Sequence, residues 1–166
     1  KQRSKPLALP GLYNLENAAA ALLAARHAGV AIQDSLVGLQ QFRGVKRRLE
    51  HLGTFNGVRV YDDFAHHPTA IRRTVDAVRE SAQGRVLVVL EPRSNSMKLG
   101  AHRAGLAPSL AAADRVWAFQ PENLPWQLSE QLADLPAASV SPDIQTIVHD
   151  VVHEARPGDE VVIMSN

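Results

Sequence analysis

Residues 58–69 read Val-Arg-Val-Tyr-Asp-Asp-Phe-Ala-His-His-Pro-Thr, a short β-type run that ends in two carboxylates, two imidazoles and a proline. Proline suits the first turn of a helix, so Pro68 places the two histidines at a helix N-terminus. In open α/β sheets, ligands bind beyond the carboxyl ends of the strands, where helix N-termini supply free N–H groups to anions. The stretch therefore predicts a strand, a loop that faces a ligand, and a helix.

A second apolar run, Val86–Leu90, ends in the same way, in the polar loop Glu91-Pro92-Arg93-Ser94-Asn95-Ser96-Met97-Lys98. Two further strand candidates are Arg115–Phe119 and Glu160–Met164. Continuous apolar runs of this length are typical of parallel strands buried on both faces, and the segments between them have helical periodicity. We therefore expect an α/β fold with a Rossmann-like, mostly parallel sheet flanked by helices.

Local signals predict the remaining elements. Asn56-Gly57 is a strong turn signal, which joins residues 49–55 and 58–61 as a hairpin. Asn14 is expected to cap a helix that ends at His27 and Ala28, with Gly29 as its stop. Further helices are predicted over residues 33–42, 69–81, 99–113 with a bend or a restart at Pro108, and 144–155 with Asp143 as its cap.

Composition limits the class of protein. The 166 residues include 18 basic and 17 acidic side chains, for a net charge of +1, and carry no block of like charge. This balance disfavours binding to nucleic acid or to a membrane surface. The absence of cysteine excludes disulfides and thiolate chemistry and fits a reducing compartment. With no apolar run near the ~20 residues that span a bilayer and no secretory segment, the cytoplasm is the default location.

A dedicated metal site is not expected. Adjacent histidines seldom point at one ion, and no further cluster has the spacing of metal ligands. His149 and His153, four residues apart on a helix, also suggest a chelating pair, but they lie off its apolar stripe and fit a solvated face. The candidate metal ligands are Asp62, Asp63, His66 and His67. The carboxylates of the two aspartates could still meet Mg²⁺ held by a nucleotide.

Other chemistries are disfavoured by what the chain lacks. It has neither a G-x-S-x-G motif nor a cysteine for nucleophilic hydrolysis, and the later strands do not supply the aspartate of a phosphoacceptor receiver domain. The phosphate-binding motif G-x-x-x-x-G-K-[ST] is absent, so most phosphate contacts of any nucleotide would lie elsewhere. The remaining candidates are the cations Arg47 and Arg48, and Arg93 with Lys98, which flank a helix start suited to an anion or a carboxylate.

Four segments together resemble the closing third of a Mur ligase, a family that builds peptidoglycan precursors by ATP-dependent amide formation. They are Gly-Leu-Tyr-Asn-Leu-Glu-Asn at 11–17, Gly-Val-Lys-Arg-Arg-Leu-Glu at 44–50, Asp-Asp-Phe-Ala-His-His-Pro at 62–68 and the loop 91–100. The resemblance implies that residues 1–43 are a helical tail of the central ATPase domain. Residues 44–166 are then the family's C-terminal α/β domain, which we expect to be truncated at its C-terminus.

The resemblance also implies roles for single residues. Asn14 and Asn17 match asparagines that bind the adenine, Arg48 matches an arginine that reaches the nucleotide phosphates, and Asp63 matches a carboxylate that holds the ribose hydroxyls. Arg93 is expected to bind a peptide carboxylate, because a planar guanidinium suits that group. Tyr13 stands where the family usually has histidine. The residues expected to face the incoming amine and its peptide are His66, His67, Arg93, Ser94, Asn95 and Lys98.

The loop 91–100 most resembles the branch of the family that joins UDP-N-acetylmuramate to the murein tripeptide L-alanyl-γ-D-glutamyl-meso-diaminopimelate during peptidoglycan recycling. ATP would phosphorylate the muramate carboxylate, with Mg²⁺ held mainly by the central domain, and the tripeptide amine would attack the acyl phosphate. Arg48 and His67 are the expected catalytic residues, with His67 as a base or as a positioning group. The partners would be the enzyme's own N-terminal and central domains, without which this chain would be inactive.

Two alternatives remain open from the residues. The double histidine also fits the UDP-N-acetylmuramate L-alanine ligases, although their loop usually has histidine where Arg93 stands. A non-catalytic α/β binding or regulatory module would share the polar strand ends without the reaction.

Overall fold

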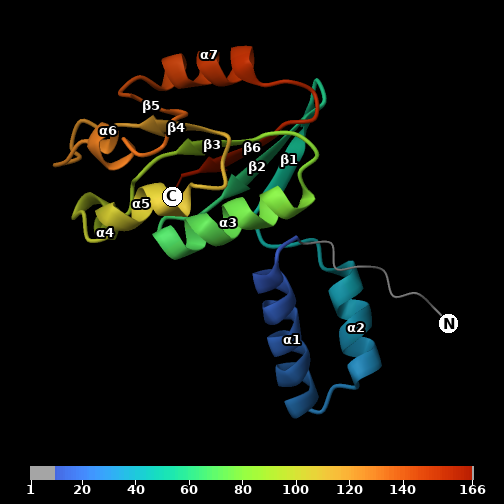
Figure 1. Cartoon of the computed structure of the whole chain (residues 1–166). Coiled ribbons are helices and arrows are strands. Elements are labelled where there is room, and N and C mark those ends of the chain that lie inside the picture. The colour runs from blue at the N-terminus through green and yellow to red at the C-terminus, as the bar shows by residue number, and fades with distance from the viewer. Residues whose placement is uncertain (1–9, 166) are drawn as a thin grey trace. The chain divides into compact units, whose positions relative to one another are not determined.

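The computed structural model describes residues 10–165, which divide into two compact units between Val45 and Lys46. The predicted boundary, between residues 43 and 44, lies two residues before this division. Figure 1 shows the first unit as a pair of helices and the second as a sheet with helices on both of its faces.

The first unit is a helical hairpin of α1 (Leu12–His27) and α2 (Ile32–Gln41). Gly29 ends α1 as predicted, with a φ of 87° that favours glycine. The prediction that Asn14 caps this helix is wrong. The cap position belongs to Gly11, and Asn14 lies in the first turn, where its side-chain N–H donates to the Pro10 carbonyl at 2.6 Å.

The second unit contains a six-stranded sheet in the order β1-β2-β6-β3-β4-β5. Only β1 and β2 are antiparallel, and all other neighbours pair in parallel, which confirms the predicted fold class. The predicted hairpin is also present, with Asn56 and Gly57 at φ values of 50° and 80° in its two-residue turn. The strands are β1 (Glu50–Phe55), β2 (Val58–Asp63), β3 (Val86–Leu90), β4 (Arg115–Phe119), β5 (Ala138–Ser141) and β6 (Glu160–Met164).

Helices lie on both faces of the sheet (Figure 1). One face carries α3 (Pro68–Ser81), whose buried stripe includes Ile71, Val75 and Val78, together with α4 (Asn95–Lys98) and α5 (Leu106–Ser109). The opposite face carries α7 (Ile144–Glu154). The 3-10 helix η1 (Arg103–Gly105) precedes α5, and α6 (Leu128–Gln131) lies between β4 and β5 in the chain.

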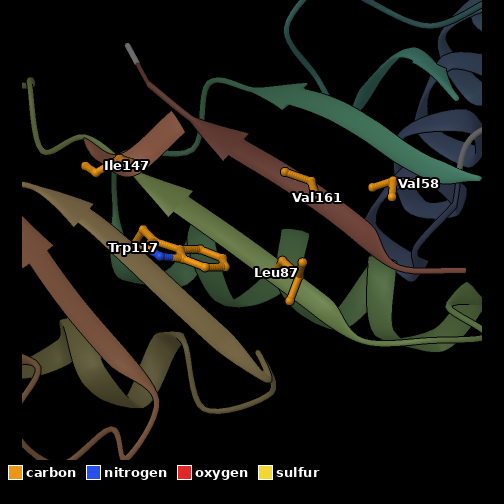
Figure 2. Packing of buried hydrophobic residues seen from close by; sticks show 5 residues of the cluster. All are labelled: Val58, Leu87, Trp117, Ile147 and Val161. Carbon is orange, nitrogen blue, oxygen red and sulfur yellow. The ribbon is translucent and has the colours of Figure 1, made fainter. Parts of the chain in front are cut away.

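The core beneath α7 follows from strand alternation. Side chains two residues apart share one face of a strand, so each strand sends alternate apolar residues toward α7. Figure 2 shows the buried members of this cluster, which come from β2, β3, β4, β6 and α7. They are Val58, Leu87, Trp117, Ile147 and Val161.

An apolar groove of about 720 Å³ runs between α7 and the sheet. Its lining includes Val60, Ile163 and Val148, and the outward side chains of Ile144 and Val152 stay more than half exposed. Within residues 10–165, α7 is the only helix that Figure 1 shows on this face. A single helix is about 10 Å wide and cannot cover a six-stranded sheet, which explains the groove.

The prediction of a helix over residues 99–113, bent or restarted at Pro108, is wrong. The helical structure begins earlier, at Asn95, with Ser94 as its cap, and breaks into α4, η1 and α5. Gly100, at a φ of 69°, ends α4. The short elements α6 and β5 were not predicted, because neither has a long periodic pattern.

Candidate functional site

The carboxyl ends of three neighbouring strands meet at one edge of the sheet. Asp63 on β2 and Leu90 on β3 both lie opposite Met164 on β6, which is paired between them. The loops that follow β2 and β3 therefore leave the sheet at the same level. The two polar loops therefore begin at one edge of the sheet, where ligands of open α/β sheets bind.

A chain of polar contacts links these three ends. Arg47 pairs with Asp62 at 3.4 Å and donates to the Ser165 carbonyl, so the segment before β1 is tied to the ends of β2 and β6. The Ser165 hydroxyl in turn donates to Glu91 at 2.5 Å. Glu91 lies 3.9 Å from Arg93, whose side chain is 62% exposed. Arg93 therefore retains a guanidinium that faces solvent, as the binding of a carboxylate requires.

Asp63 is buried, with 3% of its surface exposed. Its carboxylate accepts hydrogen bonds from the N–H groups of Leu49 and Ala65, both at 2.7 Å, and from the Thr74 hydroxyl at 3.3 Å. Burial raises the pKa of Asp63, while these bonds and the charge of Arg48 oppose the rise. The carboxylate thus fixes the backbone segments that surround it. Its predicted contact with ribose hydroxyls stays a prediction, and the burial of Asp63 does not support it.

The Asp63 bonds hold a tight turn that carries Arg48. Arg47 and Leu49 on either side have left-handed φ values of 58° and 47°, which non-glycine residues seldom adopt. The Phe64 N–H donates to the Arg47 carbonyl at 2.8 Å and closes the turn onto the end of β2. Both guanidiniums lie over the Phe64 ring, at 5.1 Å for Arg47 and 5.7 Å for Arg48. Arg48 is exposed and remains available to a phosphate.

The two histidines occupy the N-terminus of α3, as predicted. His67 is the cap residue, and its Nδ1 accepts a hydrogen bond from the Thr69 N–H at 3.2 Å. Pro68 takes the first helical position. The ring of His66 packs edge-on against Phe64 at 5.0 Å between centroids, and its Nδ1 lies 2.9 Å from the Phe64 carbonyl oxygen.

His102 also belongs to this corner, although it was not predicted. Its ring meets the ring of His67 edge-on, with 4.1 Å between centroids. No local motif marks His102, because it follows the break at Gly100 and reaches His67 only through the packing of η1 beside α3. Only the tertiary structure brings the two rings together.

The loop after β3 is anchored from beneath. Ser94 caps α4 by accepting from the Met97 N–H at 3.3 Å, and the side chain of Met97 is buried. The indole N–H of Trp126 donates to the carbonyls of Met97 and Lys98, at 3.2 and 3.1 Å. On α4, Asn95 is exposed and Lys98 is half-buried. Trp126 was missed because its role depends on a partner 28 residues away.

In the first unit, Asn14 and Asn17 are three residues apart on α1 and therefore share one face. Asn17 is exposed, while Asn14 uses its N–H to bond Pro10 and keeps its amide oxygen. Across residues 10–165 there is no group of three histidine or acidic side chains placed to hold a metal ion. No helix in that range is both long and apolar enough to cross a bilayer.

Residues 47–166 match the family model described as Mur ligase, glutamate ligase domain. The chain is 48% identical over 161 residues to the UDP-N-acetylmuramate–L-alanyl-γ-D-glutamyl-meso-2,6-diaminoheptandioate ligase of Escherichia coli K12, covering 95% of this chain and 35% of that protein. It is 38% identical to the UDP-N-acetylmuramate–L-alanine ligase of Mycolicibacterium vanbaalenii, with 95% and 35% covered. The crystal structure of the murein peptide ligase of Psychrobacter arcticus matches 93% of this chain and 34% of its own, at 39% identity and a TM-score of 0.70.

Proposed function

Because the chain belongs to the Mur ligase family, we propose that it is the amine-side part of an ATP-dependent ligase that joins UDP-N-acetylmuramate to the tripeptide L-alanyl-γ-D-glutamyl-meso-diaminopimelate. The chain spans about a third of the length of the relatives it matches, so the proposal concerns the activity of a longer enzyme. The observation that carries it is the shared strand edge, from which the loop with the exposed Arg93 and the loop with two histidines at a helix start both leave the sheet.

The residues present suit an acceptor with a carboxylate. Arg93 and Lys98 flank the loop after β3, and within residues 10–165 the guanidinium of Arg93 has only a 3.9 Å contact with Glu91. A carboxylate can form two parallel hydrogen bonds with a guanidinium, which fixes its orientation as well as its position. The diaminopimelate-bearing tripeptide has several carboxylates, whereas alanine has one. This difference favours the tripeptide as the acceptor.

The alternative acceptor is L-alanine, as in the relative from M. vanbaalenii. Both reactions use an amine that attacks an activated muramate, so the α3 corner fits either one. The discriminating position is Arg93, which offers a cation where the alanine-specific branch is expected to have histidine.

The described residues fit part of an ATP site. Arg48 is exposed at the strand edge and can contact a phosphate group, and the turn that carries it is fixed by Asp63. When bound, ATP supplies the phosphoryl group that activates the muramate carboxylate. The Mg²⁺ of the reaction is not accounted for by residues 10–165, which place no cluster of three acidic or histidine side chains together. We assign the metal and most phosphate contacts to the central domain of the longer enzyme.

The experiment is a competition between acceptors, using a full-length enzyme that contains this domain. Phosphate release is measured with UDP-N-acetylmuramate, ATP and either the tripeptide or L-alanine. The proposal expects kcat/KM to be at least about 100-fold higher for the tripeptide, a difference of roughly 2.7 kcal/mol. Replacing Arg93 by alanine should remove most of this preference. Higher activity with alanine would assign the enzyme to the other branch, and no ATP-dependent turnover with either amine would overturn the proposal.

A further inference from the structure

We infer that His66, and not His67, accepts the proton of the attacking amine through its Nε2, while His67 acts beside it as a hydrogen-bond donor. This assignment deepens the proposed function and rests on it. The sequence alone could not predict this assignment, because it does not distinguish the two adjacent imidazoles.

The hydrogen bond of His66 fixes its neutral tautomer. A carbonyl oxygen can only accept, so the 2.9 Å contact between His66 Nδ1 and the Phe64 oxygen requires the proton to be on Nδ1. A neutral imidazole has one N–H, and Nε2 of His66 therefore carries a free lone pair. That lone pair can take up a proton without breaking any bond of the folded chain.

The hydrogen bond of His67 fixes the opposite tautomer. A backbone N–H can only donate, so Nδ1 of His67 must be the acceptor for Thr69 at 3.2 Å. The ring proton is then on Nε2, which becomes a donor. Protonating this ring would place a second N–H against the Thr69 N–H and remove the cap of α3. The positioning role, one of the two predicted for His67, is therefore the one that this geometry permits.

Both outward nitrogens are open to a ligand. In the part of the chain that the structure describes, neither Nε2 has a hydrogen-bond partner within the protein. The only buried side-chain nitrogen or oxygen there that lacks a partner is the indole nitrogen of Trp117, so both Nε2 atoms reach solvent. One corner of the domain thus offers an acceptor and a donor on adjacent residues.

The surroundings of His66 connect it with the phosphate side of the reaction. Its ring packs on Phe64, the same ring that carries the guanidiniums of Arg47 and Arg48. Other titratable groups of this corner include Asp62 and Glu50, which both contact Arg47, the buried Asp63, and the rings of His67 and His102. One aromatic side chain therefore contacts both the proposed proton acceptor and the arginine proposed to meet a phosphate.

The attacking nitrogen loses two protons as the amide forms. The acceptor peptide arrives with an α-ammonium, and His66 Nε2 takes one of its protons to leave a nucleophilic amine. The amine nitrogen forms a bond to the acyl-phosphate carbonyl carbon, and the bond from that carbon to the phosphate oxygen breaks. The second proton lost by the nitrogen leaves with the phosphate, and His66 returns its proton to solvent. The Nε2–H of His67 donates to an oxygen of the acceptor and orients it.

The tautomers can be tested on this chain directly, without assuming any function. Long-range ¹⁵N–¹H NMR at a pH of about 8, where free imidazoles are neutral, distinguishes a protonated ring nitrogen from a bare one. We expect His66 to show Nδ1–H with a bare Nε2, and His67 to show the reverse. His66→Asn and His67→Asn variants assign the signals. The same tautomer in both rings would overturn the inference.

Kinetics on a full-length enzyme containing this domain test the proton transfer. His66→Asn keeps an N–H at the Nδ1 position and deletes the Nε2 lone pair, so kcat should fall about 100-fold and lose its acidic pH limb, with little change in KM. His67→Asn keeps a cap acceptor for Thr69 and should instead raise the KM of the amine several-fold with the pH profile intact. The reverse pattern would overturn the assignment. Absence of ligase turnover in the unaltered enzyme would refute the proposed function and this step with it, while NMR still decides the tautomers.

Discussion

Asp63 shows how a single buried carboxylate can place a cation at a distance from itself. Its bond to the Leu49 N–H holds a turn in which Arg47 and Leu49 both have left-handed φ values. Such conformations cost energy and persist only where neighbouring bonds enforce them. Arg48 is therefore fixed at the strand edge by a residue that it does not contact through a hydrogen bond.

Replacing Asp63 by asparagine should test this role. The amide can accept from Ala65 and Thr74, but its NH₂ group faces the Leu49 N–H, so one buried donor loses its partner. We expect the free energy of unfolding of this chain to fall by about 1–3 kcal/mol, measured by urea denaturation. The matched variant Asp62→Asn removes a partly exposed ion pair with Arg47 and should cost less than about 1 kcal/mol. Equal losses in the two variants would contradict the structural role of Asp63.

The function of Arg48 can be separated from that of the turn. In a full-length enzyme, Arg48→Ala should lower kcat/KM for ATP by the equivalent of about 1.5–3 kcal/mol, because a charge-assisted hydrogen bond to phosphate is lost. Arg72→Ala, which removes an exposed cation from α3, is the control and should leave ATP kinetics unchanged. Unaltered kinetics for Arg48→Ala would exclude it from the phosphate site.

At the scale of the elements, the short helix α4 depends on an anchor outside itself. Four residues do not form a stable helix alone, and the Trp126 N–H holds the carbonyls of Met97 and Lys98. In a full-length enzyme, Trp126→Phe should raise the KM of the acceptor amine several-fold with little effect on the KM of ATP. Trp117→Phe is a suitable control, because its indole N–H has no partner within residues 10–165. It should leave both KM values unchanged, even though it loosens the core.

The success of the sequence predictions depended on how local the determining signal was. The hairpin at Asn56-Gly57 and the start of α3 at Pro68 were predicted correctly, since turn and cap preferences act within a few residues. The helix over residues 99–113 failed because Gly100 breaks the periodic pattern. The burial of Asp63 and the meeting of His67 with His102 depend on segments far apart in sequence. No local pattern could have predicted either of them.

At the scale of the whole molecule, ion pairs make stability depend on acid pH. Burial works against the ionised forms of Asp159 and Asp114, but their bonds to Arg85 and Arg79 prevail and lower both pKa values below the ordinary 3.8. Stability from these groups is present above that value and is lost as the pH falls through the lower folded pKa. Asp63 acts in the opposite sense: because its pKa is raised in the folded chain, its contribution to the free energy of unfolding increases as the pH falls.

Urea denaturation between pH about 4 and about 2 should therefore show a fall in the free energy of unfolding of this chain, because the folded pKa values of these two carboxyls lie below the ordinary 3.8. The Asp159→Asn variant should be less stable at neutral pH and should lose less on acidification, since one of the titrating groups has been removed. An equally steep fall in this variant would show that Asp159 is not among the groups responsible.

This chain alone should bind ATP weakly. It has no glycine-rich phosphate loop, and three or four hydrogen bonds of about 1 kcal/mol each give a dissociation constant of roughly 1 mM. Calorimetry with ATP and this chain measures the value. Micromolar affinity would contradict the assignment of most phosphate contacts to the central domain.

The uncovered groove beside α7 also has a practical consequence at the bench. Environment-sensitive dyes such as ANS fluoresce when they bind accessible apolar surface, and Ile144, Val148 and Val152 offer such a surface in the native state. A dye-based thermal melt of this chain should start from a high signal and understate the transition. The intrinsic emission of Trp117 and Trp126, both shielded from water in the native state, would report its melting more faithfully.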